Sequence, residues 1–292
     1  MPKQSIAGLN WYDLSEPDSP ELDELAKQYQ LHELDVEDCR KRPQRAKYTE
    51  QPHYIFCVLK HLHEDQRLAF DDFDLFLGRD FLITVHKGRE DVLDRVRQRI
   101  AEEQTTRVDR VAYIVIDAIV DEYMPTLDEI AEQTADIEDE VLENPTPEML
   151  RSIYALKRKL IGFRRNASGM RDVINAISRR ENGIAADDLD PYFRDIYDHL
   201  IRIVELIESY RDLLTSSLDI YLSAVANRTN EVVKVLTIYG TVATPLVIIT
   251  GFFGMNLPLP LQDKPHGTLM AFGLMVLSTI IVLWYFKRKR WF

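Results

Sequence analysis

The sequence is poor in cysteine, with only Cys39 and Cys57 among its 292 residues. Two cysteines are too few for a disulfide framework, and neither has metal-ligand spacing, so we expect a reducing compartment. Residues 1–14 lack an apolar core of signal-peptide length, which favours a cytoplasmic location for this end. The sequence also lacks a phosphate-binding P-loop and a nucleophile–base pair with catalytic spacing, so ATP-driven pumping and enzymatic catalysis have no site.

Basic side chains are fewer than acidic ones, and the formal net charge is −12 at pH 7. A nucleic-acid partner needs a basic face, which this balance argues against. A cation is the more natural ligand for such a chain, although most acidic proteins are simply soluble.

Charge almost disappears after Lys234. Residues 235–254 contain no charged side chain, and neither do residues 268–286. Each run is long enough to cross roughly 30 Å of hydrocarbon as a helix. Two buried core helices are the alternative, but soluble cores rarely supply two such runs separated by a short turn.

The flanking charges predict an orientation. Residues 287–290 are all basic, and Arg228 and Lys234 precede the first run, whereas the loop at 255–267 carries only Asp263, Lys264 and His266. The positive-inside rule therefore places both chain ends in the cytoplasm, and we expect a multi-pass protein of the plasma (inner) membrane. Two helices cannot enclose a water-filled path, so a pore would require several copies around an axis.

The first 110 residues mix strand and helix signals. Residues 53–63 and 74–88 are rich in β-branched and aromatic residues, which is typical of strands. Residues 19–30 and 90–103 predict amphipathic helices, the first capped by Ser19 or Asp18 before a proline. We therefore predict a mixed α/β cytoplasmic domain over residues 1–110, in the α+β class.

Residues 111–190 are predicted to be helical. No basic residue lies between Arg110 and Arg151, and acids crowd residues 121–145. Such a run is usually a solvated helix face, or it attracts cations if it lies near a membrane mouth. Residues 154–177 are basic, so the two segments predict an antiparallel helical hairpin of opposite charge.

One long helix is predicted from about Tyr192 to Phe253, because Gly240 is the first Gly or Pro after Pro191. Its length would be on the order of 90 Å at 1.5 Å per residue, too long for a globular domain. The remaining segments are predicted as a cytoplasmic stalk (191–234), transmembrane helix 1 (235–254), an external loop (255–267), transmembrane helix 2 (268–286) and a basic cytoplasmic tail (287–292).

Small and polar residues recur on one face of this helix. They are separated by 7, 4, 3 and 7 residues and comprise Asn230, Thr237, Thr241, Thr244 and Gly251. Such a stripe is typical of helix packing in membranes, and it also suits a pore lining. The two interpretations are compatible if copies of the helix pack around a channel.

The C-terminal part resembles a known family. Residues 229–256, TNEVVKVLTIYGTVATPLVIITGFFGMN, followed by a short loop, a second span and KRKRWF, closely resemble the CorA family of divalent-cation channels, whose signature is GMN in this position. The similarity continues upstream through PYFRDIYDH and covers essentially the whole chain. It implies a funnel-shaped homopentamer whose partners are itself, membrane lipid and divalent cations.

The resemblance implies a central pore. Its selectivity filter would be Gly254, Met255 and Asn256, where amide side chains hold a hydrated cation at the outer mouth. Because Mg²⁺ dehydrates reluctantly, a neutral ring can bind its water shell without stripping it, whereas carboxylates would hold the ion too tightly. The pore-lining and gate residues implied are Asp219, Thr229, Asn230, Val233, Leu236, Gly240, Thr244, Val247 and Gly251.

Two positions depart from the family pattern. Thr244 stands where members often carry Met, and residues 257–267 are poorer in acids than the usual external loop. The first departure weakens an apolar constriction, and the second bears on cation capture and on the preferred metal.

The resemblance also implies regulation by cytoplasmic Mg²⁺ bound between subunits. The matching acids are Glu37, Asp38, Asp117 and Asp195. Carboxylates are suitable ligands for this hard cation. Bound ions would bridge subunits and hold the pore shut, and their loss would leave like charges facing each other.

The sequence is compatible with three alternative functions. The first is channel-like uptake of hydrated Mg²⁺, with Co²⁺ or Ni²⁺ as secondary substrates, driven by membrane potential. The second is zinc transport by the same fold, as in ZntB, for which His61 and His63 are a hint, although alternating strand histidines are usually surface residues. The third is a membrane-anchored coiled-coil scaffold, which predicts no ion flux.

Overall fold

The computed structural model of the chain describes residues 9–62, 69–88, 91–179, 184–255 and 266–291. It divides into two compact units, Met1–Leu218 and Asp219–Phe292. The units are described separately. The finer boundaries at 110, 190, 234 and 267 stay predictions.

The first unit contains a five-stranded mixed sheet in the order β1-β5-β4-β3-β2. Strands β2, β3, β4 and β5 pair antiparallel, whereas β1 pairs parallel with β5. The strands are β1 (Trp11–Leu14), β2 (Lys47–Glu50), β3 (Tyr54–Leu62), β4 (Phe70–Gly78) and β5 (Leu82–Val85). The sheet is the predicted mixed type.

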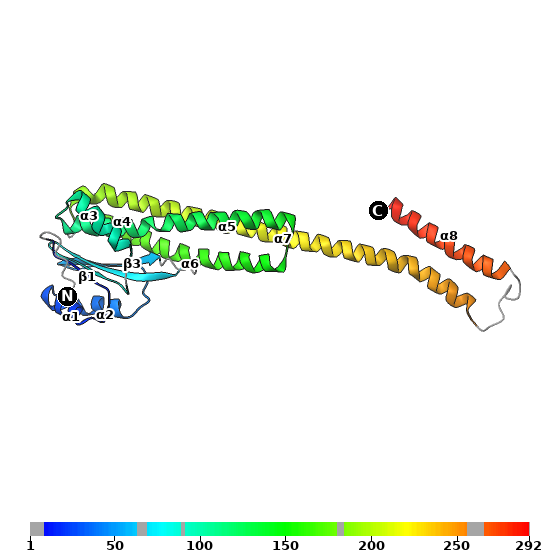
Figure 1. Cartoon of the computed structure of the whole chain (residues 1–292), viewed down its shortest axis with the longest axis horizontal. Coiled ribbons are helices and arrows are strands. Elements are labelled where there is room, and N and C mark those ends of the chain that lie inside the picture. Colours follow the sequence, from blue (N-terminus) through cyan, green and yellow to red (C-terminus); the bar gives the residue numbers. More distant parts are fainter. Residues whose placement is uncertain (1–8, 63–68, 89–90, 180–183, 256–265, 292) are drawn as a thin grey trace. The chain divides into compact units, whose positions relative to one another are not determined.

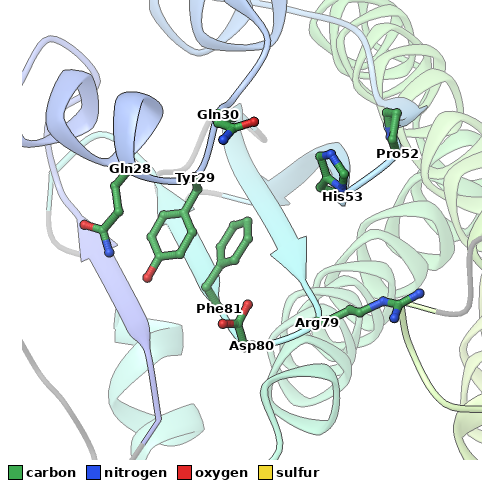
Figure 2. A pocket seen from close by; sticks show the side chains of 8 residues that line it. All are labelled: Gln28, Tyr29, Gln30, Pro52, His53, Arg79, Asp80 and Phe81. Carbon is green, nitrogen blue, oxygen red and sulfur yellow. The ribbon is translucent and has the colours of Figure 1, made fainter.

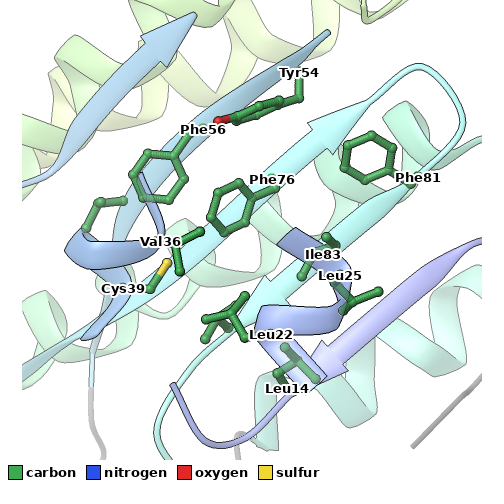
Figure 3. Close-up of a cluster of buried hydrophobic side chains, with 12 residues drawn as sticks. Leu14, Leu22, Leu25, Val36, Cys39, Tyr54, Phe56, Phe76, Phe81 and Ile83 are labelled. Atoms are coloured by element: carbon green, nitrogen blue, oxygen red, sulfur yellow. The ribbon is translucent and has the colours of Figure 1, made fainter. Parts of the chain in front are cut away.

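Two short helices, α1 (Pro20–Gln28) and α2 (Glu33–Arg40), cover one face of the sheet (Figure 1). Alternate strand residues point at them and form a continuous core (Figure 3), which includes Leu14, Leu22, Leu25, Val36, Cys39, Phe56, Phe76 and Ile83. The rings of Phe56 and Phe76 lie 4.6 Å apart between their centroids. Successive side chains of a strand point to opposite faces, so every second residue of these buried strands enters this layer.

The opposite face of the sheet carries helices α4 (Val108–Asp121) and α6 (Pro147–Ser178). The other helices of this unit are α3 (Asp91–Glu103), α5 (Tyr123–Glu143), the short 3₁₀ helix η1 (Asp187–Leu189) and the first part of α7 (Asp190–Phe253). Helices α5 and α6 pack side by side. Tyr123 and Phe163 are buried where α5, α6 and the sheet meet.

Local details correct two expectations. The run 74–88 holds the end of β4 and all of β5, with a turn at Arg79 and Asp80 between them. Ser19 occupies the N-cap position of α1, but its side chain makes no capping hydrogen bond.

The second unit consists of the rest of α7 and of helix α8 (His266–Arg288). Both helices are long and apolar enough to cross a membrane. Among the described residues of this unit, only Tyr221, Gly267 and Phe286 are buried. Helix α7 is continuous from Asp190 to Phe253, with Pro245 inside it, so the predicted long helix is confirmed.

Candidate metal-ion sites

The nine predicted pore-lining residues, Asp219 to Gly251, lie on one side of α7. At 3.6 residues per turn they fall within an arc of about 120°. All nine are exposed in the protomer. A side chain built on Gly240 or Gly251 would meet no neighbouring atom within 4 Å. This arc is therefore an uncovered surface of the single chain.

Threonine hydroxyls along α7 bond to the helix itself. Thr237, Thr241 and Thr244 donate to the carbonyl four residues earlier, at 2.7, 2.7 and 2.8 Å. Each hydroxyl oxygen keeps lone pairs that accept further hydrogen bonds. A hydrated cation presents water hydrogens outward, so this face offers acceptors of the required kind.

The C-terminal end of α7 carries the predicted filter. Helix α7 ends at Phe253, and the amide of Gly254 donates to the Thr250 carbonyl at 2.9 Å. A Cβ atom on Gly254 would lie 3.0 Å from that carbonyl oxygen, which is tighter than normal contact. Met255 follows with an exposed side chain, and Asn256 lies outside the described residues.

The four predicted regulatory acids do not converge in one protomer. Glu37 and Asp38 lie on α2, Asp117 on α4 and Asp195 on α7. Helix α2 covers one face of the sheet and α4 the other. Within the part of the chain that the structure describes, no three His, Cys, Asp or Glu side chains are placed to hold a metal ion. A bridging site would need acids from a neighbouring copy.

Three of the four predicted regulatory acids already have a lysine or arginine partner from their own chain, and the fourth lies near a histidine. Lys41 pairs with Glu37, and the Lys47 ammonium lies 2.5 Å from an Asp38 oxygen. These acids keep carboxylate chemistry suited to Mg²⁺, but a metal ion would have to compete with the tethered cations. Arg99 Nη1 lies 2.6 Å from Asp117 Oδ2, and His199 Nε2 lies 3.9 Å from Asp195 Oδ2.

A buried network behind α2 was not predicted. Arg42 donates to Asp74 Oδ2 at 2.5 Å, to the Cys39 carbonyl at 2.8 Å and to the Val85 carbonyl at 3.1 Å. Burial raises the pKa of the Asp74 carboxyl to about 7, against the opposing effect of Arg42. This arginine joins the end of α2, which carries Glu37 and Asp38, to β4 and β5.

The structure bears on His61, which was considered as a ligand for a softer metal such as zinc. His61 is 5% exposed on β3, and its Nε2 lies 2.7 Å from Glu122 Oε2. It is therefore an internal residue and not the expected surface one. His63 lies outside the described residues.

A depression of about 570 Å³ opens beside the α1–α2 connection (Figure 2). Its wall includes Tyr29 and Phe81, whose rings stack with centroids 4.0 Å apart. Arg79, Asp80 and His53 also line it, but none of the predicted metal residues does.

Comparisons with known proteins bear on the whole chain. The profile of the family described as "CorA-like Mg2+ transporter protein" matches residues 7–288. The chain is 35% identical over 269 residues to the "Cobalt/magnesium transport protein CorA" of Thermotoga maritima, which covers 89% of this chain and 77% of the relative.

Two further comparisons concern the fold and the alternative metal. The solved structure of the "CorA magnesium transporter from Methanocaldococcus jannaschii" matches with a TM-score of 0.86 and 24% identity, over 97% of this chain and 91% of that one. The fold class is thereby confirmed. A shorter match, 29% identical over 179 residues, is to the "Zinc transport protein ZntB" of Pectobacterium atrosepticum, covering 61% of this chain and 54% of the relative.

Proposed function

The chain belongs to the CorA-like Mg2+ transporter family, and from this premise we propose that it conducts hydrated Mg²⁺ through a homopentameric pore in the plasma membrane. It is a membrane transporter of divalent cations and not an enzyme. Co²⁺ and Ni²⁺ are the proposed secondary substrates, since the relative of Thermotoga maritima is named for cobalt and magnesium. Both chain ends would lie in the cytoplasm.

One observation carries the proposal. The arc of α7 from Asp219 to Gly251 is uncovered in the protomer and combines oxygen acceptors with small residues. In a single copy, the part of this face beyond Lys234 would lie against lipid, where polar groups are costly. Several copies around an axis would instead turn it toward a shared water-filled path. The membrane potential would then drive a divalent ion with about 4.6 kcal/mol per 100 mV.

The residues have separate roles along this path. Asn256 would contact the water shell of the ion at the outer mouth, with Gly254 and Met255 shaping the turn. Val233 and Leu236 would form an apolar constriction that closes by dewetting. Asp219 would attract the cation at the inner end. Bound cytoplasmic Mg²⁺ at Glu37, Asp38, Asp117 and Asp195 would hold neighbouring subunits together and keep the pore shut.

The test is Mg²⁺ flux into vesicles that contain the purified protein and a Mg²⁺-sensitive dye, with an imposed potential. We expect flux in the parent, none in Asn256→Ala, and flux at high internal Mg²⁺ in Asp38→Ala/Asp195→Ala. Native mass measurement should give five copies. A single copy, or flux that Asn256→Ala leaves intact, would contradict the pore.

Zinc transport is the second candidate, because of the match to ZntB. The same vesicles loaded with a Zn²⁺ dye separate the two candidates. Flux of Zn²⁺ without Mg²⁺ would favour zinc, and absence of both fluxes would favour the scaffold.

A further inference from the structure

We propose that Arg99 is a built-in competitor of the regulatory divalent cation, because its guanidinium occupies Asp117 and has to leave before a metal ion can bind there. The inference rests on the proposed regulation by cytoplasmic Mg²⁺. The inference concerns the affinity of this chain for the regulatory cation. That affinity depends on Arg99 as well as on the carboxylate ligands.

The first step is the contact itself. Asp117 is 8% exposed, and its Oδ2 accepts from Arg99 Nη1 at 2.6 Å and from the Tyr113 hydroxyl at 3.3 Å. The guanidinium also lies 5.5 Å from the centre of the Tyr113 ring. The oxygen that a metal ion would use is therefore engaged by a positive charge and a hydroxyl of the same chain.

The second step is that Arg99 has another position to move to. Its Nε lies 3.0 Å from Glu103 Oε1, one turn along α3, and its side chain is 36% exposed. An arginine guanidinium stays protonated throughout the physiological pH range, so it remains a cation wherever it moves. A cation arriving at Asp117 would displace the guanidinium toward Glu103 and solvent.

The third step is the charge left behind. Asp121 lies four residues after Asp117 on α4, so the two carboxylates share one helix face. Without Arg99, this face would present unneutralised acids, which bind a divalent cation more tightly. An opposite charge in direct contact changes the affinity of a carboxylate for a competing cation by about tenfold or more.

The experiment measures cation binding directly, on the purified full-length chain in detergent, with Mn²⁺ as a paramagnetic probe of the Mg²⁺ sites. Arg99→Gln should lower the half-saturating Mn²⁺ concentration about tenfold. Arg97→Gln is the matched control: Arg97 lies two residues away on α3 and pairs with Asp94 and with Asp13 of β1, neither of which is a candidate ligand. It should leave binding unchanged.

Epistasis locates the effect. Arg99→Gln combined with Asp117→Asn should bind Mn²⁺ like Asp117→Asn alone, because the competitor acts through that carboxylate. Arg99→Lys keeps a charge without the planar fork and should give an intermediate shift, which provides a readout if Arg99→Gln does not fold. Equal or weaker Mn²⁺ binding in the folded Arg99 variants would overturn the inference.

This readout is independent of transport. If the Arg99 variants bind Mn²⁺ more tightly in a protein that passes no Mg²⁺, the inference stands and the pore proposal fails. If the parent conducts but the variants bind Mn²⁺ as the parent does, only the inference fails.

Discussion

The two units of the protein differ in how far their apolar side chains are buried within a single chain. The first unit covers its apolar side chains and pairs its buried charges within one chain, as Phe76 and the Arg42–Asp74 pair illustrate. The described residues of the second unit leave large apolar side chains such as Leu236 and Phe252 exposed, at 71% and 53%. Such an apolar surface requires lipid or another protein surface to cover it.

This difference separates what one chain can do from what an assembly must do. The first unit has a buried core and internal ion pairs, so the proposed regulation would have to work against contacts that are already made, as at Asp117. The second unit has an uncovered arc on α7, so the proposed conduction would depend on several copies of the chain. The predictions below test this contrast.

The largest expected effect compares the same substitution in the two units. Phe76→Ala should lower the free energy of unfolding of the first unit by about 3–5 kcal/mol, because the Phe76 ring is fully buried. Phe252→Ala should change it by less than about 0.5 kcal/mol. Urea unfolding in detergent measures both, in a background where Trp284 and Trp291 are replaced by Phe.

In that background the fluorescence comes from Trp11, which is 2% exposed in the first unit and donates to Thr84 Oγ1 at 3.1 Å. Equal losses for Phe76→Ala and Phe252→Ala would show that the first unit depends on the second for its stability.

A second comparison concerns ion pairs. Arg42→Met should cost about 3 kcal/mol, because it leaves the buried Asp74 carboxyl and the Cys39 and Val85 carbonyls without the hydrogen bonds that Arg42 donates. Arg164→Met should cost less than about 1 kcal/mol, since Arg164 and Glu208 are each about half exposed. Adding Asp74→Leu to Arg42→Met should recover part of the loss, because the buried carboxyl that lost its hydrogen-bond partner is then removed. A smaller cost at Arg42 than at Arg164 would refute the importance of this network.

The third prediction addresses the second unit. Gly240 and Gly273 both have open space around them in the protomer. If copies surround the arc of α7, Gly240→Leu would narrow the path and lower Mg²⁺ flux at least tenfold, equivalent to about 1.4 kcal/mol. Gly273→Leu on α8 should leave most of the flux. Dye-loaded vesicles measure both, and unchanged flux in Gly240→Leu would remove this face of α7 from the pore.

The features that could be predicted from the sequence are those that correspond to long runs of one residue type or to long stretches without helix breakers. The two apolar spans and the continuous helix α7 follow from runs without charge or helix breakers. Strand β3 follows from its β-branched and aromatic content. The turn at Arg79 and Asp80 was missed because apolar residues on both sides hide it.

The unpredicted parts of the candidate site depend on contacts between distant residues. Arg42 and Asp74 are 32 residues apart in the sequence. Arg99 and Asp117 are 18 residues apart and lie on different helices, α3 and α4. No helical or strand period joins such positions. The Lys41–Glu37 ion pair could have been predicted from the sequence, because residues four apart share a helix face. The roles of Asn256 and the regulatory acids come from family resemblance, since an isolated acid is usually a surface residue.

The smallest expected effect is a pH dependence of the free energy of unfolding that arises from Asp74. Its carboxyl titrates near 3.9 in an unfolded chain, and burial raises the pKa to about 7 in the folded one. Between these values the folded state holds a proton that the unfolded state has lost. The free energy of unfolding should therefore fall as pH rises from 5 to 7, by up to about 1 kcal/mol per pH unit.

Asp74→Asn should flatten that fall, and the difference between parent and variant isolates Asp74 from other groups. Asp109→Asn is the control: burial opposes its charge, but the Arg107 guanidinium and the backbone amides of Ala186 and Arg110 hold the pKa of Asp109 below its usual value. Its contribution is complete above pH 5 and is lost only as pH falls further, so the slope between pH 5 and 7 should not change. An equal slope in the parent and in Asp74→Asn would mean that Arg42 keeps Asp74 ionised throughout, and that the first unit contains a permanent buried ion pair rather than a titrating one.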